Sequence, residues 1–153
     1  MPLKECSKDQ GKDVEKMNAI ETAQKILEES FVGTMATIQG NKPHSRYMTF
    51  FNDDFILYTA TSKKTEKVSE IKSNPYTHIL IGYDGDGFGD AYLEIMGTVD
   101  ISNDENLKEK LWNEHMEPWF EGPQDPDLII LKVTPESILL LNKKGQEPQS
   151  IEF

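Results

Sequence analysis

The chain has 153 residues, of which 37% are hydrophobic, and its formal net charge of −11 gives a pI near 4.7. This length and apolar content predict one domain with a core that needs neither disulfides nor a structural metal. The acidic balance argues against a sequence-independent nucleic-acid binder and against docking on anionic membranes, since both need a broad basic surface. No apolar run is long enough to span a membrane and no signal-peptide pattern opens the chain, so we expect a cytoplasmic protein.

The first half of the chain predicts an arm, a helix and three strands. Residues 1–12 are charged and without periodicity, and we expect a flexible arm there. From Val14 to Ser30 apolar residues recur every three or four positions, which predicts an amphipathic helix over one side of a core. Strand-like segments follow at 31–39, 44–51 and 55–60, with turn sequences between them. These segments are apolar on both faces, which favours a closed barrel over an open sheet.

The second half predicts two more helices among further strands. A short helix is expected over 65–73, with Thr65 as its N-cap. A longer helix is expected from Ser102 or Asn103 to about Met116. The further strands are expected at 76–83, 91–101, 128–133 and 137–141. We therefore expect one antiparallel barrel domain over 13–142 with helices at its ends, followed by a polar tail over 143–153.

Positive charge is concentrated in one place in this acidic chain. Arg46, the only arginine, lies inside an apolar strand-like run, and three lysines follow within 61–67 among serine and threonine hydroxyls. A guanidinium and a Lys/Ser/Thr cluster at a helix start are what a bound phosphate ester needs. The alternative is a solvated lysine face beside a strand-edge arginine. No Walker motif or GxGxxG fingerprint accompanies the segment, so the residues leave both readings open.

The remaining polar residues predict neither a metal site nor a nucleophile. The loop 84–90 fails the EF-hand template because apolar residues stand at two of its ligand positions. The three histidines share no ligand spacing, so zinc is not expected. Cys6 has no basic surroundings that would activate its thiol. Trp119 and Phe120, in a loop rich in Pro and Gly, either pack in the core or form an interface or a stacking wall for a planar ligand. No catalytic side chain can be named.

An ordered set of segments resembles the pyridoxamine 5′-phosphate oxidase-like split-barrel flavoproteins, and most closely their bacterial general stress protein group. The resemblance spans roughly residues 18–142, and the order of the segments carries it rather than any single motif. The matching segments are 31–37, 43–48, 58–61, 67–75, 94–99, 119–123, 125–128 and 133–136.

This resemblance implies a mainly β fold, a six- to seven-stranded antiparallel split β-barrel with flanking helices. It also implies a homodimer that binds FMN at the subunit interface. In the family an arginine of the second strand and a lysine opening the next helix hold the phosphate, which correspond to Arg46 and Lys67 here. Tyr92 stands where the oxidase has an amide side chain. The implied cofactor-binding residues are Arg46, Tyr47, Met48, Thr49, Tyr58, Thr59, Thr61, Lys64, Thr65, Lys67, Tyr92, Trp119 and Phe120.

The chain also departs from the oxidase. The oxidase has C-terminal basic residues, including a histidine, for its substrate. After Leu141 this chain offers only Asn142-Lys143-Lys144-Gly145-Gln146 and an acidic end, so oxidation of pyridoxamine phosphate is not expected. We expect instead an FMN-dependent oxidoreductase or a flavin reservoir with a general stress role. The alternative is a non-enzymatic barrel that binds haem, a deazaflavin or another planar or phosphorylated ligand, or only a protein partner.

Overall fold

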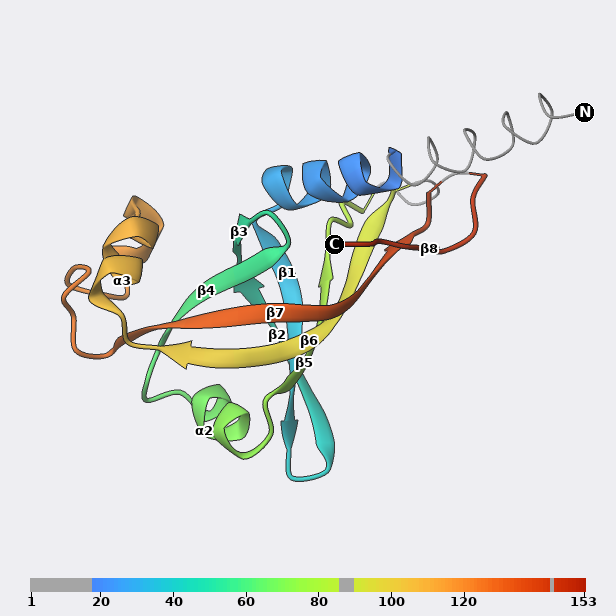
Figure 1. Ribbon diagram of the computed structural model, residues 1–153. Coiled ribbons are helices and arrows are strands. Elements are labelled where there is room, and N and C mark those ends of the chain that lie inside the picture. The colour runs from blue at the N-terminus through green and yellow to red at the C-terminus, as the bar shows by residue number, and fades with distance from the viewer. Residues whose placement is uncertain (1–17, 86–89, 144) are drawn as a thin grey trace, which may run out of the picture.

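The computed structural model of the chain describes residues 18–85, 90–143 and 145–153 (Figure 1). The arm expected at 1–12 lies outside these residues. The strands are β1 (Val32–Gln39), β2 (Lys42–Thr49), β3 (Phe51–Asp53), β4 (Ile56–Ser62), β5 (Tyr76–Ile81), β6 (Tyr92–Ser102), β7 (Leu128–Leu141) and β8 (Gln149–Ser150). The helices are one over 18–29, α2 (Glu66–Ser73), α3 (Glu105–Leu111) and the 3₁₀ helix η1 (Glu114–Met116).

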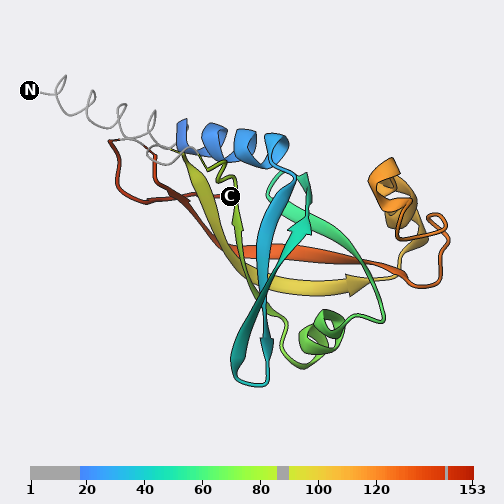
Figure 2. The ribbon, with the colours of Figure 1, turned by 180° about the vertical axis from the view of Figure 1, so that it is seen from behind.

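All eight strands belong to one antiparallel sheet. Its order is β2-β1-β5-β6-β7-β4-β3, with β8 paired to β7. Alternate residues of β1, β4, β5 and β6 are buried, as expected for strands that line one core. The helix over 18–29 covers one end of the curled sheet and α2 lies at the other end (Figures 1 and 2). This arrangement confirms the mainly β barrel that the sequence predicts.

The barrel is split between β2 and β4, which are not neighbours in the strand order. The hydroxyl of Thr59, on β4, donates to the carbonyl of Thr49, on β2, at 2.7 Å. Thr59 is 1% exposed, so this bond lies inside the wall at the split. The two strands therefore stay close without a ladder of backbone hydrogen bonds.

The expectation of two strands around Thr134-Pro135 is wrong. The chain forms one strand, β7, and its pairing with β6 shifts register between Met96 and Gly97. A proline has no N–H to donate, and at such a bulge it needs none. A Cβ on Gly97 would lie 2.3 Å from the Thr134 carbonyl oxygen, so only glycine allows this approach.

Two helix starts differ in detail from the prediction. The cap of α3 is Asp104 rather than Ser102 or Asn103, and its carboxylate accepts from the backbone N–H groups of Asn106 and Leu107. The longer helix expected to about Met116 also ends at Leu111, and η1 follows separately. Thr65 does stand at the N-cap of α2, but its side chain makes no cap hydrogen bond there.

The final segment joins the barrel instead of forming only a polar tail. Residues Gln149–Ser150 pair with β7, and Ile151 is 4% exposed within the core. The ring of Phe153 contacts that of Phe55, with centroids 5.9 Å apart. Ile151 and Phe153 are the two apolar residues of a polar segment, too few for a period from which to predict this strand.

Within residues 18–85, 90–143 and 145–153, no helix covers the outer face of β2, β1, β5 and β6. Val32, Tyr47, Tyr76 and Met96 are 51–78% exposed there. The apolar character of both strand faces therefore does not reflect burial by this chain's own helices. Among the described residues, no helix has the length and apolarity to cross a membrane.

Candidate ligand-binding site

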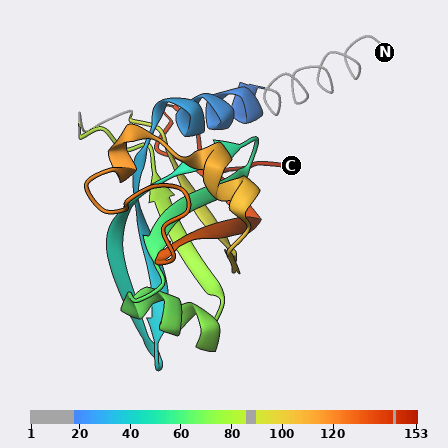
Figure 3. The ribbon, with the colours of Figure 1, turned by 90° about the vertical axis from the view of Figure 1, so that its left-hand side faces the viewer.

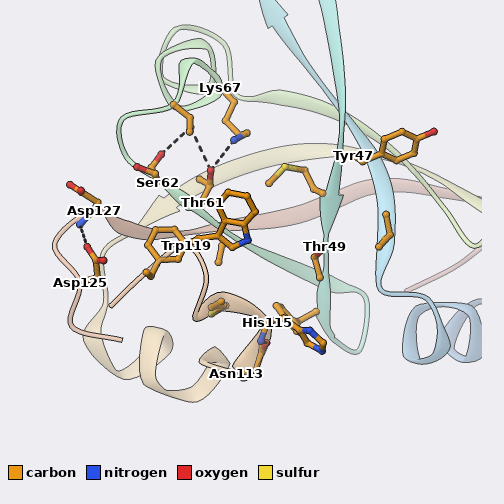
Figure 4. A pocket seen from close by; sticks show the side chains of 17 residues that line it. Tyr47, Thr49, Thr61, Ser62, Lys67, Asn113, His115, Trp119, Asp125 and Asp127 are labelled. Atoms are coloured by element: carbon orange, nitrogen blue, oxygen red, sulfur yellow. Dashed lines mark hydrogen bonds between the residues drawn. The ribbon is translucent and has the colours of Figure 1, made fainter. Parts of the chain in front are cut away.

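A cavity of about 590 Å³ opens where β2, β4, the start of α2 and the loop after α3 meet (Figure 4). Figure 3 shows the ribbon from the side on which α3 and the loop after it face the viewer. This volume is in the range of sites for small organic ligands. Its wall combines apolar and polar side chains from these four elements. The lining residues are Val32, Tyr47, Met48, Thr49, Phe51, Ala60, Thr61, Ser62, Thr65, Lys67, Asn113, His115, Met116, Trp119, Phe120, Asp125 and Asp127.

One end of the cavity is built by the turn from β4 into α2. The Lys67 amine donates to the Thr61 hydroxyl at 2.8 Å, and the Thr65 hydroxyl donates to the Ser62 carbonyl at 2.9 Å (Figure 4). Because the Thr65 side chain is used in this way, it does not cap the first turn of α2, although the Val68 N–H donates to the Thr65 carbonyl at 3.2 Å. An amine, hydroxyls and a helix start therefore converge here, as an anion requires.

Lys67 is half-buried at this end, and its pKa is lowered from the ordinary value. Burial is the main cause, and the positive charge of Arg46 acts in the same direction, while Glu70 opposes both. An anion placed beside the amine would favour its charged form. An anionic group bound at this end would therefore interact favourably with the charged amine of Lys67.

The loop after α3 forms the other walls. Asn113 caps η1 by accepting from the His115 N–H at 2.9 Å, and this turn brings His115 and buried Met116 to the cavity. The backbone N–H groups of Trp119 and Phe120 both donate to the Met116 carbonyl at 3.0 Å. These bonds hold the Trp119 ring at the cavity although it is 80% exposed (Figure 4).

Two carboxylates also line the cavity, and both have partners. Asp127 pairs with Lys64 at 3.3 Å and lies 4.0 Å from Lys63. Asp125 accepts from the backbone N–H groups of Glu121 and Asp127, and these two bonds lower the pKa of its carboxyl. The aspartates therefore fix the loop next to the start of α2 and occupy two of the nearby lysines.

Arg46 does not line the cavity but belongs to a cluster behind it, in the barrel wall. We name Thr37, His44, Arg46 and Glu70 the Arg46 cluster. The guanidinium donates to the Thr37 hydroxyl at 2.8 Å, to the Met35 carbonyl at 3.2 Å and to the Glu70 carboxylate at 3.2 Å. The Thr37 hydroxyl in turn donates to Glu70. The side chain of Glu70 is only 7% exposed.

The protonation of this cluster follows from its geometry. His44 Nδ1 lies 2.9 Å from a Glu70 oxygen and 3.0 Å from an Arg46 nitrogen. One ring nitrogen cannot donate to the first and accept from the second at once. The hydrogen bond from Thr37, and then those from His44 and Arg46, lower the pKa of Glu70 and outweigh burial, which raises it. Because Glu70 is ionised, Nδ1 carries the proton and donates to it.

The structure gathers part of the predicted cofactor-binding set. Eight of its residues line the cavity: Tyr47, Met48, Thr49, Thr61, Thr65, Lys67, Trp119 and Phe120. Five do not: Arg46, Tyr58, Thr59, Lys64 and Tyr92. Thr59 bonds across the split, Lys64 pairs with Asp127, and Arg46 is held in its cluster.

Tyr92 lines a second hollow of about 400 Å³ on the outer face of the sheet. Its ring packs edge-on against Tyr83, with centroids 6.1 Å apart. Val32 and Tyr47 line both this hollow and the main cavity. The two hollows are therefore adjacent, and Val32 and Tyr47 form an exposed apolar ridge between them.

Sequence reasoning missed several cavity residues. Val32, Phe51 and Ala60 lie within predicted strands and Ser62 lies in the 61–67 cluster, so alternation along those strands could have found some of them. Asn113, His115 and Met116 fall where a continuous helix was expected, although an Asn followed by a Pro-bounded loop is a signal for a new turn. Within the described parts of the chain, no group of three His, Cys, Asp or Glu side chains is arranged to hold a metal ion.

Comparison with known proteins agrees with the fold. The model of the pyridoxamine 5′-phosphate oxidase family matches residues 19–142. General stress protein 26 of Bacillus subtilis (strain 168) is 50% identical over 140 residues, which cover 90% of this chain and all of the relative. The crystal structure of general stress protein 26 from Bacillus anthracis str. Sterne is 32% identical with a TM-score of 0.76, over 86% of this chain and 98% of that one.

A mainly β split barrel with a cavity beside the split defines the class of protein, and the matches give the family. The chain belongs to the pyridoxamine 5′-phosphate oxidase family. Within this family it resembles general stress protein 26.

Two further solved structures with this fold are named for other ligands. A heme binding protein from Mycobacterium smegmatis has a TM-score of 0.70 at 15% identity, over 86% of this chain and 57% of that one. An F420 reductase has a TM-score of 0.62 at 28% identity, over 75% of this chain and 94% of that one. The fold alone therefore does not select the ligand.

Proposed function

We propose that this protein binds FMN in the cavity beside the split, acts as a homodimer, and serves as a flavin-dependent oxidoreductase in a general stress response. The observation that supports this most directly is the division of one cavity into a cationic, hydroxyl-rich end and an apolar, aromatic wall. A flavin mononucleotide has the same two parts, a phosphate and a planar ring system. Relatives that carry the general stress protein name support the stress role.

The residues present fit such a cofactor. Lys67 and the hydroxyls of Thr61 and Ser62 would hold the phosphate beside the start of α2. Met48 and Trp119 would contact the ring system and exclude water from it. The bound flavin would supply the redox chemistry, and the protein supplies its position and surroundings.

A partner subunit would complete the site. Val32 and Tyr47 are exposed and line both hollows of one chain. A second copy placed on the outer face would bury this ridge and roof the cavity. After Leu141 the chain has only Lys143 and Lys144 as basic residues and no histidine, which argues that pyridoxamine phosphate is not the substrate.

A spectrum and a titration test this proposal. We expect purified protein either to be yellow, with flavin absorbance between the near-ultraviolet and the blue, or to quench FMN fluorescence with a Kd of about 1 µM or below, which corresponds to about 8 kcal/mol. Riboflavin is the matched ligand without a phosphate and should bind more weakly. A colourless protein that quenches neither flavin contradicts the proposal.

Haem is the second candidate, and one residue favours it. His115 is the one histidine that lines the cavity within the described part of the chain, and imidazole is a common axial ligand of haem iron. Under this alternative, haem titration gives a shifted Soret band that is lost in His115→Ala, and haem displaces FMN. If the haem spectra of the wild type and of His115→Ala do not differ, haem is ruled out as the ligand.

A further inference from the structure

In the Arg46 cluster, the Glu70 carboxylate is a negative charge of the chain itself that accepts a hydrogen bond from Arg46. Glu70 accepts from Thr37, from His44 at 2.9 Å and from Arg46 at 3.2 Å. A hydroxyl, an imidazole N–H and a guanidinium are also what an exogenous phosphate would use. Because Glu70 is 8% exposed and these donors surround its carboxylate, it fills the anion position of the cluster from within the chain.

This cluster is electrically linked to the cavity. Lys67 lies three residues before Glu70 on α2, so the two side chains are neighbours along one face of the helix. The charges of Arg46 and Glu70 shift the pKa of the Lys67 amine in opposite directions. The two charges therefore offset each other, and Lys67 is the one lysine or arginine among the lining residues.

We propose that Glu70 determines the affinity of the cavity for phosphate-bearing ligands by holding the Arg46 guanidinium in the barrel wall, away from the cavity. The inference rests on the proposed function and adds to it a residue that sets anion affinity without touching the ligand. A neutral isostere at position 70 would remove the internal anion. It would leave one more net positive charge beside Lys67 and free the guanidinium to reach the phosphate.

The decisive measurement compares two flavins that differ by the phosphate. In Glu70→Gln we expect FMN affinity to rise about tenfold, the scale of one added charge-assisted hydrogen bond, while the Kd of riboflavin stays within about twofold. Higher salt should reduce the gain because the interaction is electrostatic. Equal changes for both flavins, or weaker FMN binding, overturn the proposal.

Glu66→Gln is the matched control. Glu66 lies in the first turn of the same helix and is exposed, and its replacement changes the net charge by the same amount. We expect its preference for FMN over riboflavin to match the wild type. If Glu66→Gln gives the same gain as Glu70→Gln, general charge explains the effect and the proposal fails.

A second readout does not depend on flavin. Arg46 is the only arginine, so its guanidinium gives a single set of side-chain resonances in ¹⁵N NMR. We expect slow rotation of the guanidinium in the wild type and fast rotation in Glu70→Gln. We also expect added inorganic phosphate to shift the resonances in the variant only. Fast rotation of the guanidinium in the wild type overturns the inference even if FMN binds. Slow rotation in the wild type and fast rotation in Glu70→Gln, in proteins that bind no flavin, refute the FMN proposal alone.

Thr37→Val keeps the inference testable if Glu70→Gln does not fold. It removes the hydroxyl that accepts from Arg46 and donates to Glu70, and it leaves all charges in place. We expect a smaller gain in the same direction, visible as a higher ratio of riboflavin Kd to FMN Kd. A ratio equal to that of the wild type counts against the role of the cluster.

Discussion

Lys67 and Arg46 carry the same charge but have different surroundings. Lys67 extends into the cavity and donates to the Thr61 hydroxyl at 2.8 Å. Arg46 is 18% exposed and donates to groups of the barrel wall. The charge of a residue alone therefore does not predict whether it can bind a ligand, because a buried carboxylate of the same chain can already accept its hydrogen bonds.

Lys67→Ala should weaken FMN binding by about 1.5–3 kcal/mol, the scale of a charge-assisted hydrogen bond. Riboflavin should be affected much less, since it has no phosphate for the amine to contact. Parallel fluorescence titrations of both flavins measure the difference. Lys72→Ala, an exposed lysine in the last turn of the same helix, is the control and should bind both as the wild type does.

Glu70 should make stability depend on acid pH. Its pKa is lowered below the ordinary value of 4.5 in the folded protein. Such a carboxylate contributes stability above its unfolded pKa, and this contribution is lost as the pH falls through the folded pKa. Urea unfolding should show Glu70→Gln less stable than the wild type by about 2–3 kcal/mol near neutral pH. The gap should narrow below pH 4.5. A gap of constant size would contradict this assignment.

At the scale of elements, β6 and β7 form the longest pairing in the sheet, and a bulge lies within it. Pro135 opposes Gly97 there and is buried. The bulge therefore depends on Pro135, which has no N–H to donate, and on Gly97, which has no Cβ. The bend lets β7 continue to the strand end that pairs with β8.

Gly97→Ala should destabilise the fold by about 2–3 kcal/mol, as overpacking in a rigid core does. The added Cβ would meet the Thr134 carbonyl oxygen and Pro135 Cα, which are both backbone atoms and cannot rotate away. Urea unfolding measures the loss. Gly122→Ala is the control, because its nearest neighbour is a side-chain atom at 3.6 Å. Equal stability of the two variants would mean that the bulge can relax.

At the scale of the whole molecule, several exposed apolar residues share one face. In the register of β1, β2, β5 and β6, Tyr47 aligns with Thr34 and Leu80, and Met96 aligns with His78. These side chains leave the sheet on the side away from the core. Exposed apolar residues that gather on one face, beside the polar pair of His78 and Glu94, are typical of a protein interface.

Met96→Glu should disrupt the proposed homodimer. Met96 is 51% exposed and lines neither hollow, so a charge there would be buried only when a partner covers it. We expect a monomer in sedimentation analysis and weaker FMN binding. Gln146→Glu makes the same change of charge at an exposed position in the C-terminal segment and should leave the dimer intact. A dimer that persists in Met96→Glu would contradict this interface.

The sequence by itself determined most of the elements and part of the site. Strand alternation, turn residues and helix periodicity are local signals, and they located β1, β2, β4, β5, β6, α2 and the cavity residues Thr61, Thr65 and Lys67, whereas β3 lies where a turn was expected. Tertiary structure alone decided what depends on contacts distant in sequence. Thr37, 33 residues from Glu70, joins the cluster that withholds Arg46 from the cavity. In the same way, Ile151 becomes core because its strand pairs with β7, and the loop around Trp119 becomes a wall because Asp127 pairs with Lys64.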